Sequence, residues 1–197
     1  MYRLKFLGVC VSLLVCISLF GCVLPSALST PWSENFALAT YGTEGSHPAL
    51  NDGKLETVAA IPAKNERIFM LKFPAVKPVR KIVIYNGNLY WFGVDYWDTN
   101  ALEWKTFHSA RQRRNIKNQN AQSEFVLDRL NFQTNMLRIT VSRTVDDFVI
   151  TKPVAERGDK ILNRQLTIGG VYLPHYRILQ PAWAQIREIE VYHLARK

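Results

Sequence analysis

The first candidate for chemistry in this sequence is a group of oxygen-bearing residues around a tight turn. Asp52 and Gly53 form an Asp-Gly pair, which is typical of such a turn, and Thr57 follows shortly after. A carboxylate, a hydroxyl and a nearby backbone carbonyl are ligands that a hard cation such as Ca²⁺ prefers. Most Asp-Gly turns bind no metal, so the pattern by itself also fits an ordinary turn.

Aromatic rings beside another turn are the second candidate. Tyr90 and Trp91 follow Asn86-Gly87-Asn88, whose residues tolerate the positive φ of a tight turn. Rings at a loop tip could stack on the apolar face of a sugar, or they could fill the core. Trp91→Ala is expected to weaken ligand binding while the fold stays intact. A similar group nearer the C-terminus comprises Tyr172, His175 and Tyr176.

The formal net charge of +9 at pH 7 suits either anionic partners or simple solubility. Cations are dense in one polar segment that has no acid before Glu124, which predicts an exposed loop. This loop could bind acidic sugars or lipid phosphates, or it could simply be solvated. The sequence has no nucleic-acid-binding motif, so nucleic acid is not an expected partner. The candidate ligand-binding cations of the loop are Arg113 and Arg114.

Catalysis is poorly supported by the residues. The four histidines are scattered without the spacing of metal ligands, and no serine stands in a nucleophile-elbow motif. Asp146 and Asp147 form a carboxylate pair, but adjacent residues on a strand point to opposite faces. We therefore expect a binding protein and not an enzyme.

The N-terminus predicts secretion and a lipid anchor. An uncharged apolar run from Phe6 to Phe20 follows two cations, and it is shorter than the ~20 residues of a membrane span. It ends in Leu19-Phe20-Gly21-Cys22, which resembles the lipobox of bacterial lipoproteins. These features predict a signal peptide over residues 1–21, lipidation of Cys22 and a Pro- and Ser-rich tether over residues 22–35.

Cysteine usage agrees with this interpretation. Cys10 and Cys16 lie inside the apolar run, so cleavage would leave Cys22 without a disulfide partner. A lone thiol at the first mature residue makes sense if its sulfur carries a lipid, although stable anchoring needs more than one acyl chain. An uncleaved signal anchor is the alternative. The expected location is the bacterial cell envelope, and Val23, which is not an aspartate-type retention residue, favours the outer membrane.

The remaining sequence predicts one all-β domain over residues 36–197. Apolar residues alternate in short runs between turn signals, which indicates a β-sandwich. The apolar residues of the last run do not keep one register, so a β-bulge near Glu188 is expected. Pro74 and Pro78 are expected to bound a connection. The expected strands include Phe36 to Tyr41, Arg67 to Phe73, Val79 to Tyr85, Phe125 to Leu127, Met136 to Arg143 and Ile186 to Tyr192.

A long connection, residues 145–185, separates the last two of these strands. Structureless loops beyond ~12–15 residues are uncommon in compact domains and are often functional. Within the connection, Leu166 to Leu173 predicts a hairpin with Gly169-Gly170 at its turn.

Five segments in a fixed order carry a family resemblance. They are Ala49-Leu50-Asn51-Asp52-Gly53 with Thr57, Val79 to Asn86, Glu103-Trp104-Lys105-Thr106, Leu137-Arg138-Ile139, and Arg187 to Tyr192. Together they resemble the discoidin domain, the coagulation-factor type C or galactose-binding-like family, over about Phe36 to Tyr192. The resemblance implies a jelly-roll β-sandwich that binds glycans, lipid head groups or proteins through loops at one end and is not an enzyme by itself.

The resemblance also implies a structural calcium site. Bacterial members often use an aspartate before glycine, a threonine and a late glutamate as ligands, which correspond here to Asp52, Thr57 and Glu188. The carbonyl of Leu50 is an expected addition. Lys54 stands where the family often has Asn or Asp, and an ammonium beside a dication is unfavourable. An empty or reorganised site is therefore the alternative.

The sequence thus predicts a membrane-anchored, non-catalytic module of the cell envelope that recognises carbohydrate. The alternative is an accessory lipoprotein subunit of an envelope complex, in which the long connection and the basic loop bind another protein. An exposed apolar patch on the connection would favour a protein partner. A concave pocket with a stacked ring and converging polar groups would favour a glycan.

Overall fold

The computed structural model describes residues 32–63, 65–111, 123–166 and 174–195. The chain divides into two units, of which Ser33–His193 holds all the strands. In the other unit, Trp32 and Leu194 form an isolated antiparallel bridge. No helix of the described ranges is long and apolar enough to cross a membrane. The apolar N-terminal run and Cys22 lie outside the described residues, so the signal peptide and the lipidation stay predictions.

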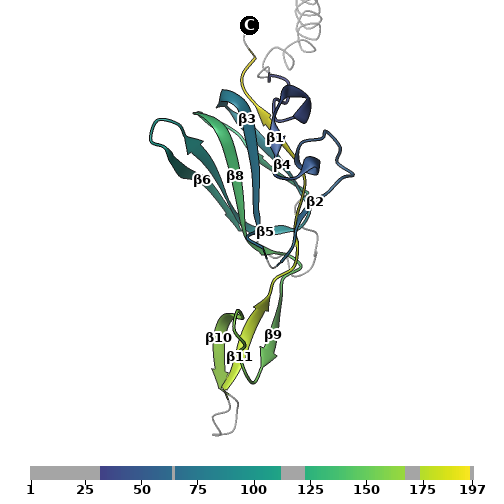
Figure 1. Ribbon diagram of the computed structural model, residues 1–197, viewed down its shortest axis with the longest axis vertical. Helices are drawn as coiled ribbons and strands as arrows, with labels where there is room; N and C mark the ends of the chain where they lie inside the picture. The colour runs from purple at the N-terminus through teal and green to yellow at the C-terminus, as the bar shows by residue number, and fades with distance from the viewer. Residues whose placement is uncertain (1–31, 64, 112–122, 167–173, 196–197) are drawn as a thin grey trace, which may run out of the picture. The chain divides into compact units, whose positions relative to one another are not determined.

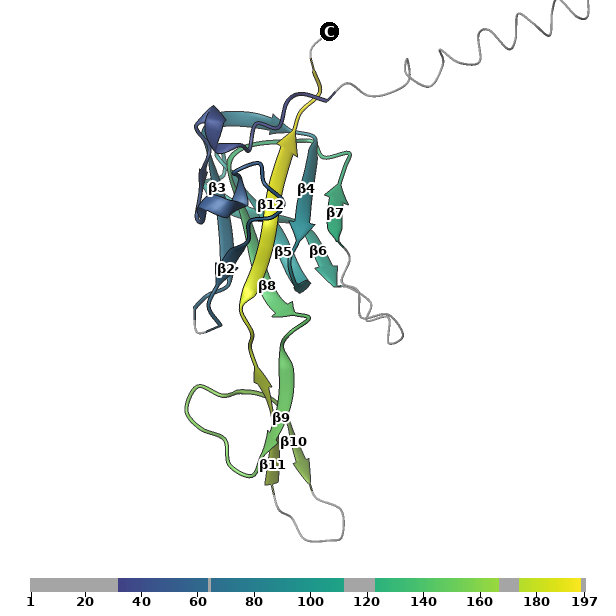
Figure 2. The ribbon, with the colours of Figure 1, turned by 90° about the vertical axis from the view of Figure 1, so that its right-hand side faces the viewer.

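Two antiparallel sheets pack face to face as a β-sandwich, seen from two sides in Figure 1 and Figure 2. The orders are β1-β3-β8-β5-β6 and β2-β12-β4-β7. The chain changes sheet at every connection of the sandwich except β5–β6, which confirms the predicted all-β jelly roll. The strands are β1 (Glu44–Gly45), β2 (Ala59–Ile61), β3 (Ile68–Val79), β4 (Lys81–Asn86), β5 (Leu89–Asp98), β6 (Glu103–Arg111), β7 (Glu124–Leu127), β8 (Phe132–Thr144) and β12 (Ala184–Tyr192).

Alternation along these strands places apolar side chains between the two sheets. Phe69 and Phe92 come from the five-stranded sheet, Ile82 and Ile189 come from the four-stranded sheet, and all four are buried in one cluster. Each such side chain contributes about 1.5–3 kcal/mol when it is buried. The core therefore holds the sheets together and fixes the turns that connect them.

Strand β12 carries the predicted bulge. Its pairing with β4 shifts register between Ile186 and Glu188. Because a bulge inserts one extra residue, Ile186 and Ile189 are both buried despite their odd spacing. The Glu188 side chain also lies inside, and only 2% of the residue is exposed.

The expected strand at Phe36 to Tyr41 is wrong. This segment ends in the 3₁₀ turn η1 (Ala39–Tyr41), and a second such turn, η2, covers Pro48–Leu50. Gly42 ends η1 with a φ of 78°, a left-handed conformation that glycine adopts without a steric penalty. The segment is therefore a turn, and its Ala37 is fully buried in the core.

The two prolines do not bound a connection, because both lie within β3. The regular pairing of β3 with β8 is interrupted between Lys72 and Lys77, so Pro74 removes no ladder donor there. Pro78 lies beyond the short strand β1, on a stretch of β3 that β1 does not pair. A proline at such an open edge is tolerated.

Nearly half of the predicted long connection forms a third sheet. It has the order β10-β11-β9, and Figure 1 shows it outside the sandwich. We call these three strands the arm. Ile178 and Leu179 are buried but do not belong to the core cluster of the sandwich. The strands are β9 (Phe148–Lys152), β10 (Lys160–Leu166) and β11 (Pro174–Gln180).

Paired strands flank the segment in which the hairpin is expected. Strands β10 and β11 pair in antiparallel register as far as Leu166 and Pro174. Residues 167–173, with the expected Gly-Gly turn, lie outside the described chain. The turn therefore stays a prediction.

A buried carboxylate joins the base of the arm to the sandwich. Asp147 accepts hydrogen bonds from Arg67 Nη1 at 2.9 Å, Thr144 Oγ1 at 2.8 Å and the Ala182 N–H at 2.8 Å. Arg67 Nη2 also donates to the Ser142 carbonyl at 2.7 Å. The chain segments that enter and leave the arm are thus tied to one another and to the segment before β3.

Asn88 makes a second connection at the same place. Its Nδ2 donates to Asp146 at 2.7 Å and to the Trp183 carbonyl at 2.8 Å, and its Oδ1 accepts from the Gln185 N–H at 2.8 Å. Gly87 is required beside it, because a Cβ there would lie 2.6 Å from the Gln185 Cβ. The predicted Asn86-Gly87-Asn88 turn exists, but it is packed against the chain and not exposed.

Candidate functional site

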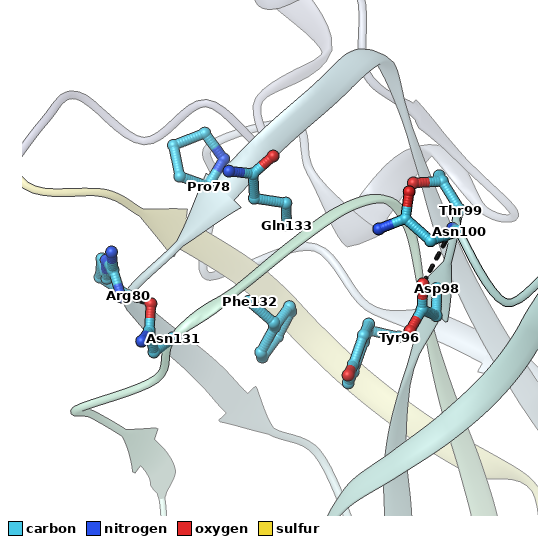
Figure 3. Close-up of a pocket in the computed structure, with 9 residues that line it drawn as sticks. All are labelled: Pro78, Arg80, Tyr96, Asp98, Thr99, Asn100, Asn131, Phe132 and Gln133. Carbon is cyan, nitrogen blue, oxygen red and sulfur yellow. Dashed lines mark hydrogen bonds between the residues drawn. The ribbon is translucent and has the colours of Figure 1, made fainter.

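A pocket of about 460 Å³ lies at the β3–β4, β5–β6 and β7–β8 turns, as Figure 3 shows. Its volume is within the usual range for small-molecule sites. The three turns are far apart in sequence, and the sandwich brings them together at one end. The lining residues are Pro78, Arg80, Tyr96, Asp98, Thr99, Asn100, Asn131, Phe132 and Gln133.

Two stacked aromatic rings form the apolar part of the lining. Tyr96 of β5 and Phe132 of β8 have ring centroids 4.3 Å apart and planes inclined by 13°. Phe107 of β6 packs against Phe132 at 4.8 Å, and all three rings pack on the core. This packing holds the rings in fixed positions, with Tyr96 and Phe132 half-buried at the pocket.

Arg80 forms one wall of the pocket. Its Nη1 donates to the Leu130 carbonyl at 3.3 Å and to Asn131 Oδ1. The Leu130 N–H donates in return to the Arg80 carbonyl at 3.0 Å. These bonds tie the β3–β4 turn to the β7–β8 turn. A guanidinium has five N–H groups, so donors remain for a ligand.

Asp98 lies on the opposite wall in Figure 3. Its Oδ2 accepts from Lys105 Nζ at 2.6 Å, and its Oδ1 accepts from the N–H groups of Asn100 and Ala101 at 2.9 and 3.1 Å. The Lys105 ammonium and then these two amides lower the pKa of Asp98 to about 2. Asp98 is therefore an ionised hydrogen-bond acceptor at neutral pH.

Carboxamides complete the lining. Asn100, Asn131 and Gln133 are exposed where the chain turns around the pocket. Each carboxamide can donate through its NH₂ group and accept through its oxygen. Together with the rings and the two charged walls, these groups suit a ligand that has many hydroxyls and an apolar face. Among the described residues that line the pocket, Asp98 is the only carboxylate.

Sequence patterns do not single out this pocket. Each of its three turns is ordinary by itself, and no motif links residues that are so far apart in the chain. The one local signal is Asp98-Thr99-Asn100, in which the aspartate side chain bonds the backbone two residues later. This signal indicates a turn but not a ligand.

The predicted cation ligands do lie together. Thr57 Oγ1 lies 3.0 and 2.9 Å from the two carboxylate oxygens of Asp52, and the Gly53 N–H donates to Glu188 Oε2 at 3.2 Å. The Leu50 side chain has no oxygen, so only its backbone carbonyl could be a ligand. Over the described ranges, no group of three or more His, Cys, Asp or Glu side chains is placed to hold a metal.

Glu188 lacks a full set of partners. Its Oε1 is buried and forms no hydrogen bond within the described chain. Burial raises the pKa of Glu188 to about 7; the Gly53 amide opposes this shift, and the charges of Asp52 and Glu190 add to it. A cation would supply the missing partner, so the residues fit the calcium that the family resemblance implies.

The predicted aromatic residues lie elsewhere. Tyr90 and Trp91 are within β5 and not at a loop tip, because Asn88 is held at the base of the arm. Trp91 is 41% exposed, and the Arg111 guanidinium lies 5.5 Å from its ring centroid. Neither Tyr90 nor Trp91 is among the residues that line the pocket. Their role in ligand binding stays a prediction.

Two of the other predicted ligand-binding residues lie on the arm. His175 and Tyr176 are half-buried on β11 of the arm. Arg113, Arg114 and Tyr172 lie outside the described residues. The sequence therefore anticipates the kind of residue that a binding site needs, but not the place where the fold assembles a pocket.

No protein-family model and no curated protein sequence matches the chain. Among solved structures, the family 32 carbohydrate-binding module of Streptococcus pneumoniae EndoD is 11% identical, with a TM-score of 0.50 over 81% of this chain and 99% of that one. Truncated AlyQ, with CBM32 and alginate lyase domains, is 10% identical, with a TM-score of 0.50 over 86% of this chain. The match covers 35% of the AlyQ chain. These similarities establish the fold, a jelly-roll β-sandwich like that of family 32 carbohydrate-binding modules.

Proposed function

We propose that this chain is a carbohydrate-binding module whose binding site is the pocket at the β3–β4, β5–β6 and β7–β8 turns. The proposal rests on one observation: the stacked rings of Tyr96 and Phe132 lie between the charged walls formed by Arg80 and Asp98. The fold also supports it, because the structures that it resembles are a carbohydrate-binding module and an enzyme chain that contains one. The proposal assigns binding to the chain, and no bond-breaking step.

A sugar in the pocket would place its apolar face against the aromatic pair and direct its hydroxyls to the walls. Asp98 accepts from a hydroxyl, Arg80 donates to a hydroxyl oxygen, and the exposed carboxamides do either. A neutral hydrogen bond contributes about 0.5–1.5 kcal/mol, and one to a charged group about 1.5–3 kcal/mol. The two charged walls would therefore fix the orientation of the sugar.

The double variant Asn100→Ala/Gln133→Ala is expected to weaken glycan binding about tenfold or more, because each change removes a neutral hydrogen-bonding group. Both side chains are exposed, so the fold should be retained. A glycan array identifies the ligand, and calorimetry then compares the affinities. Asn163→Ala, which changes an exposed carboxamide of the arm, is the matched control. An array without binding, or an unchanged affinity, contradicts the proposal.

Trp91→Ala distinguishes the pocket from the aromatic site suggested by the sequence. Because Trp91 is outside the pocket, we expect this variant to bind the glycan with unchanged affinity. The exposed ring also predicts an unfolding free energy within about 2 kcal/mol of wild type. Weakened binding with an intact fold would instead place the ligand on β5.

We also propose that Cys22 carries the lipid anchor and that the module is displayed in the bacterial cell envelope, preferably at the outer membrane. The support is the lipobox-like Leu19-Phe20-Gly21-Cys22 and the absence of any cysteine after Cys22 in the sequence. Mass spectrometry of the mature N-terminus checks this proposal. An N-terminus that still begins at Met1 contradicts it.

We further propose a structural Ca²⁺ held by Asp52, Thr57, Glu188 and the Leu50 carbonyl. The support is the buried Glu188 Oε1 that has no hydrogen bond within the described chain and the position of Asp52 beside Thr57. The backbone N–H of Lys54 donates a hydrogen bond to Asp52 Oδ1 at 2.9 Å. A bound cation would supply the positive charge that the buried carboxylate lacks.

A further inference from the structure

The two edge strands of the arm differ in how they are protected. In the order β10-β11-β9, which can be followed in Figure 1, only β11 has a neighbour on both sides. Strands β9 and β10 each leave one row of backbone N–H and C=O groups that no other described strand pairs. Such rows are templates for pairing with another chain, and proteins usually block them with charges, prolines or bulges.

Strand β10 has two of these blocking features. It contains the exposed cation Lys160. Its pairing with β11 shifts register between Ile161 and Asn163. A bulge bends a strand and increases its twist, so β10 is a poor template for a further strand.

Strand β9 has no register shift, and its one cation is ion-paired. It pairs with β11 at five consecutive positions without a register shift. Its first four residues are Phe-Val-Ile-Thr. Of these, Phe148 is 59% exposed and Val149 is 36% exposed. Its one cation, Lys152, lies 3.5 Å from Glu156 and 3.6 Å from Asp159. The free edge of β9 is therefore regular and partly apolar, and its one cation is paired with two carboxylates.

The side chains around β9 indicate what a further strand would carry. Alternate residues point the same way, so Phe148, Ile150 and Lys152 share one face of the strand. This face is apolar at its first two positions and ends in a cation. On the other face, the exposed Arg177 of β11 lies directly opposite Thr151. A strand added to β9 would be about 10 Å from β11. Because Thr151 is short, the Arg177 guanidinium can extend over it to that strand.

We propose that β9 is a docking edge for a partner protein, which adds an extended segment of alternating apolar and acidic residues as a fourth strand of the arm. The apolar side chains would lie beside Phe148 and Ile150, and the acidic ones would reach Arg177. A second copy of β9 fits less well, because β9 has no acidic residue and would bring another Arg177. The proposal goes beyond glycan binding and uses a separate surface.

The test titrates the purified full-length chain with a short capped peptide of alternating glutamate and valine. We expect saturable binding and slower hydrogen exchange of the β9 amides. A peptide of the same composition, with all its glutamates before its valines, should bind about tenfold more weakly. Arg177→Glu should weaken binding about tenfold, and Arg111→Glu, on an exposed residue of the sandwich, should leave it unchanged.

Backbone N-methylation of the peptide tests strand addition directly. Alternate amides of an added strand point toward β9, so methylation of one alternate set should abolish binding and methylation of the other should not. Equal binding of the two methylated peptides, or of the alternating and block peptides, overturns the proposal. Sedimentation velocity tests whether a second copy of the chain occupies the edge of β9 instead. A dimer that is dispersed by Thr151→Lys would assign the edge to a second copy and also overturn the proposal.

Discussion

Replacing Asp147 by alanine is expected to lower the free energy of unfolding by about 3–5 kcal/mol, the cost of removing one partner of a buried ion pair. The side chains of Arg67 and Asp147 are only 8% and 0% exposed, and they lie 2.9 Å apart. Without the carboxylate, the buried guanidinium has no counter-charge, and the donors of Thr144 and Ala182 lose their acceptor. Chemical denaturation followed by tryptophan fluorescence measures the change.

Asp128→Ala is the matched control, because Asp128 is exposed, and it should change the unfolding free energy by less than about 0.5 kcal/mol. A loss below about 1 kcal/mol for Asp147→Ala would show that Arg67 finds another partner.

The pH dependence of the unfolding free energy gives a second test. Burial raises the pKa of Asp147, but hydrogen bonds from Ala182, Arg67 and Thr144 outweigh burial and lower it below its ordinary value of 3.8. The stability contributed by Asp147 is therefore present above about pH 4 and is lost as the pH falls through the lowered pKa.

The second large effect is expected at Glu188. With calcium removed by a chelator at pH 8, Glu188→Gln should raise the free energy of unfolding by about 1–3 kcal/mol. The wild-type carboxylate is ionised there although it is buried, and its pKa is raised from 4.5 to about 7. One pKa unit corresponds to about 1.4 kcal/mol. The glutamine removes the buried charge, and scanning fluorimetry or denaturation measures the gain.

The raised pKa also fixes the direction of the pH dependence. Folded Glu188 holds its proton more tightly than the unfolded chain, so calcium-free wild type should lose stability as the pH rises from about 4.5 to about 7. Above that range the loss is complete. Calcium binds the ionised carboxylate, so it should stabilise wild type more at pH 8 than at pH 5.

Calcium should not stabilise Glu188→Gln, and Glu66→Gln, at an exposed carboxylate, should respond as wild type does. An equal calcium response in wild type and Glu188→Gln would place the cation elsewhere. If calcium stabilises wild type at neither pH, the proposal that the protein binds calcium is contradicted.

Periodicity predicts the strands of the sandwich well, because one face of each packs on a common core. The alternation of Leu137, Ile139 and Val141 identifies β8, and the broken register around Glu188 identifies the bulge of β12. The arm is harder to predict. Its strands are short, and one of them, β9, is followed at once by Pro153, so the same residues also fit a loop. Whether these residues form strands or a loop depends on pairing between distant segments, which the periodicity of the sequence does not reveal.

The candidate sites differ in the same way. Asp52 and Thr57 are close in sequence and the family resemblance supplies Glu188, so this cluster could be predicted. The pocket depends on three separate turns, and no local pattern connects Arg80 with Asp98. Trp91 was expected at a loop tip because nothing in the sequence shows that Asn88 bonds to the base of the arm.

The insertion of the arm between β8 and β12 has a mechanical consequence. Its two ends continue into strands that have neighbours on both sides, β8 in one sheet and β12 in the other. At the far end of β12, the Ser33 N–H donates to the His193 carbonyl at 2.9 Å. The His193 N–H donates in return to the Ser33 hydroxyl oxygen at 3.0 Å. Tension between the arm and Ser33 would therefore act along β12 and shear its cross-strand hydrogen bonds together. Such a strand resists extraction better than one whose hydrogen bonds are peeled apart one after another.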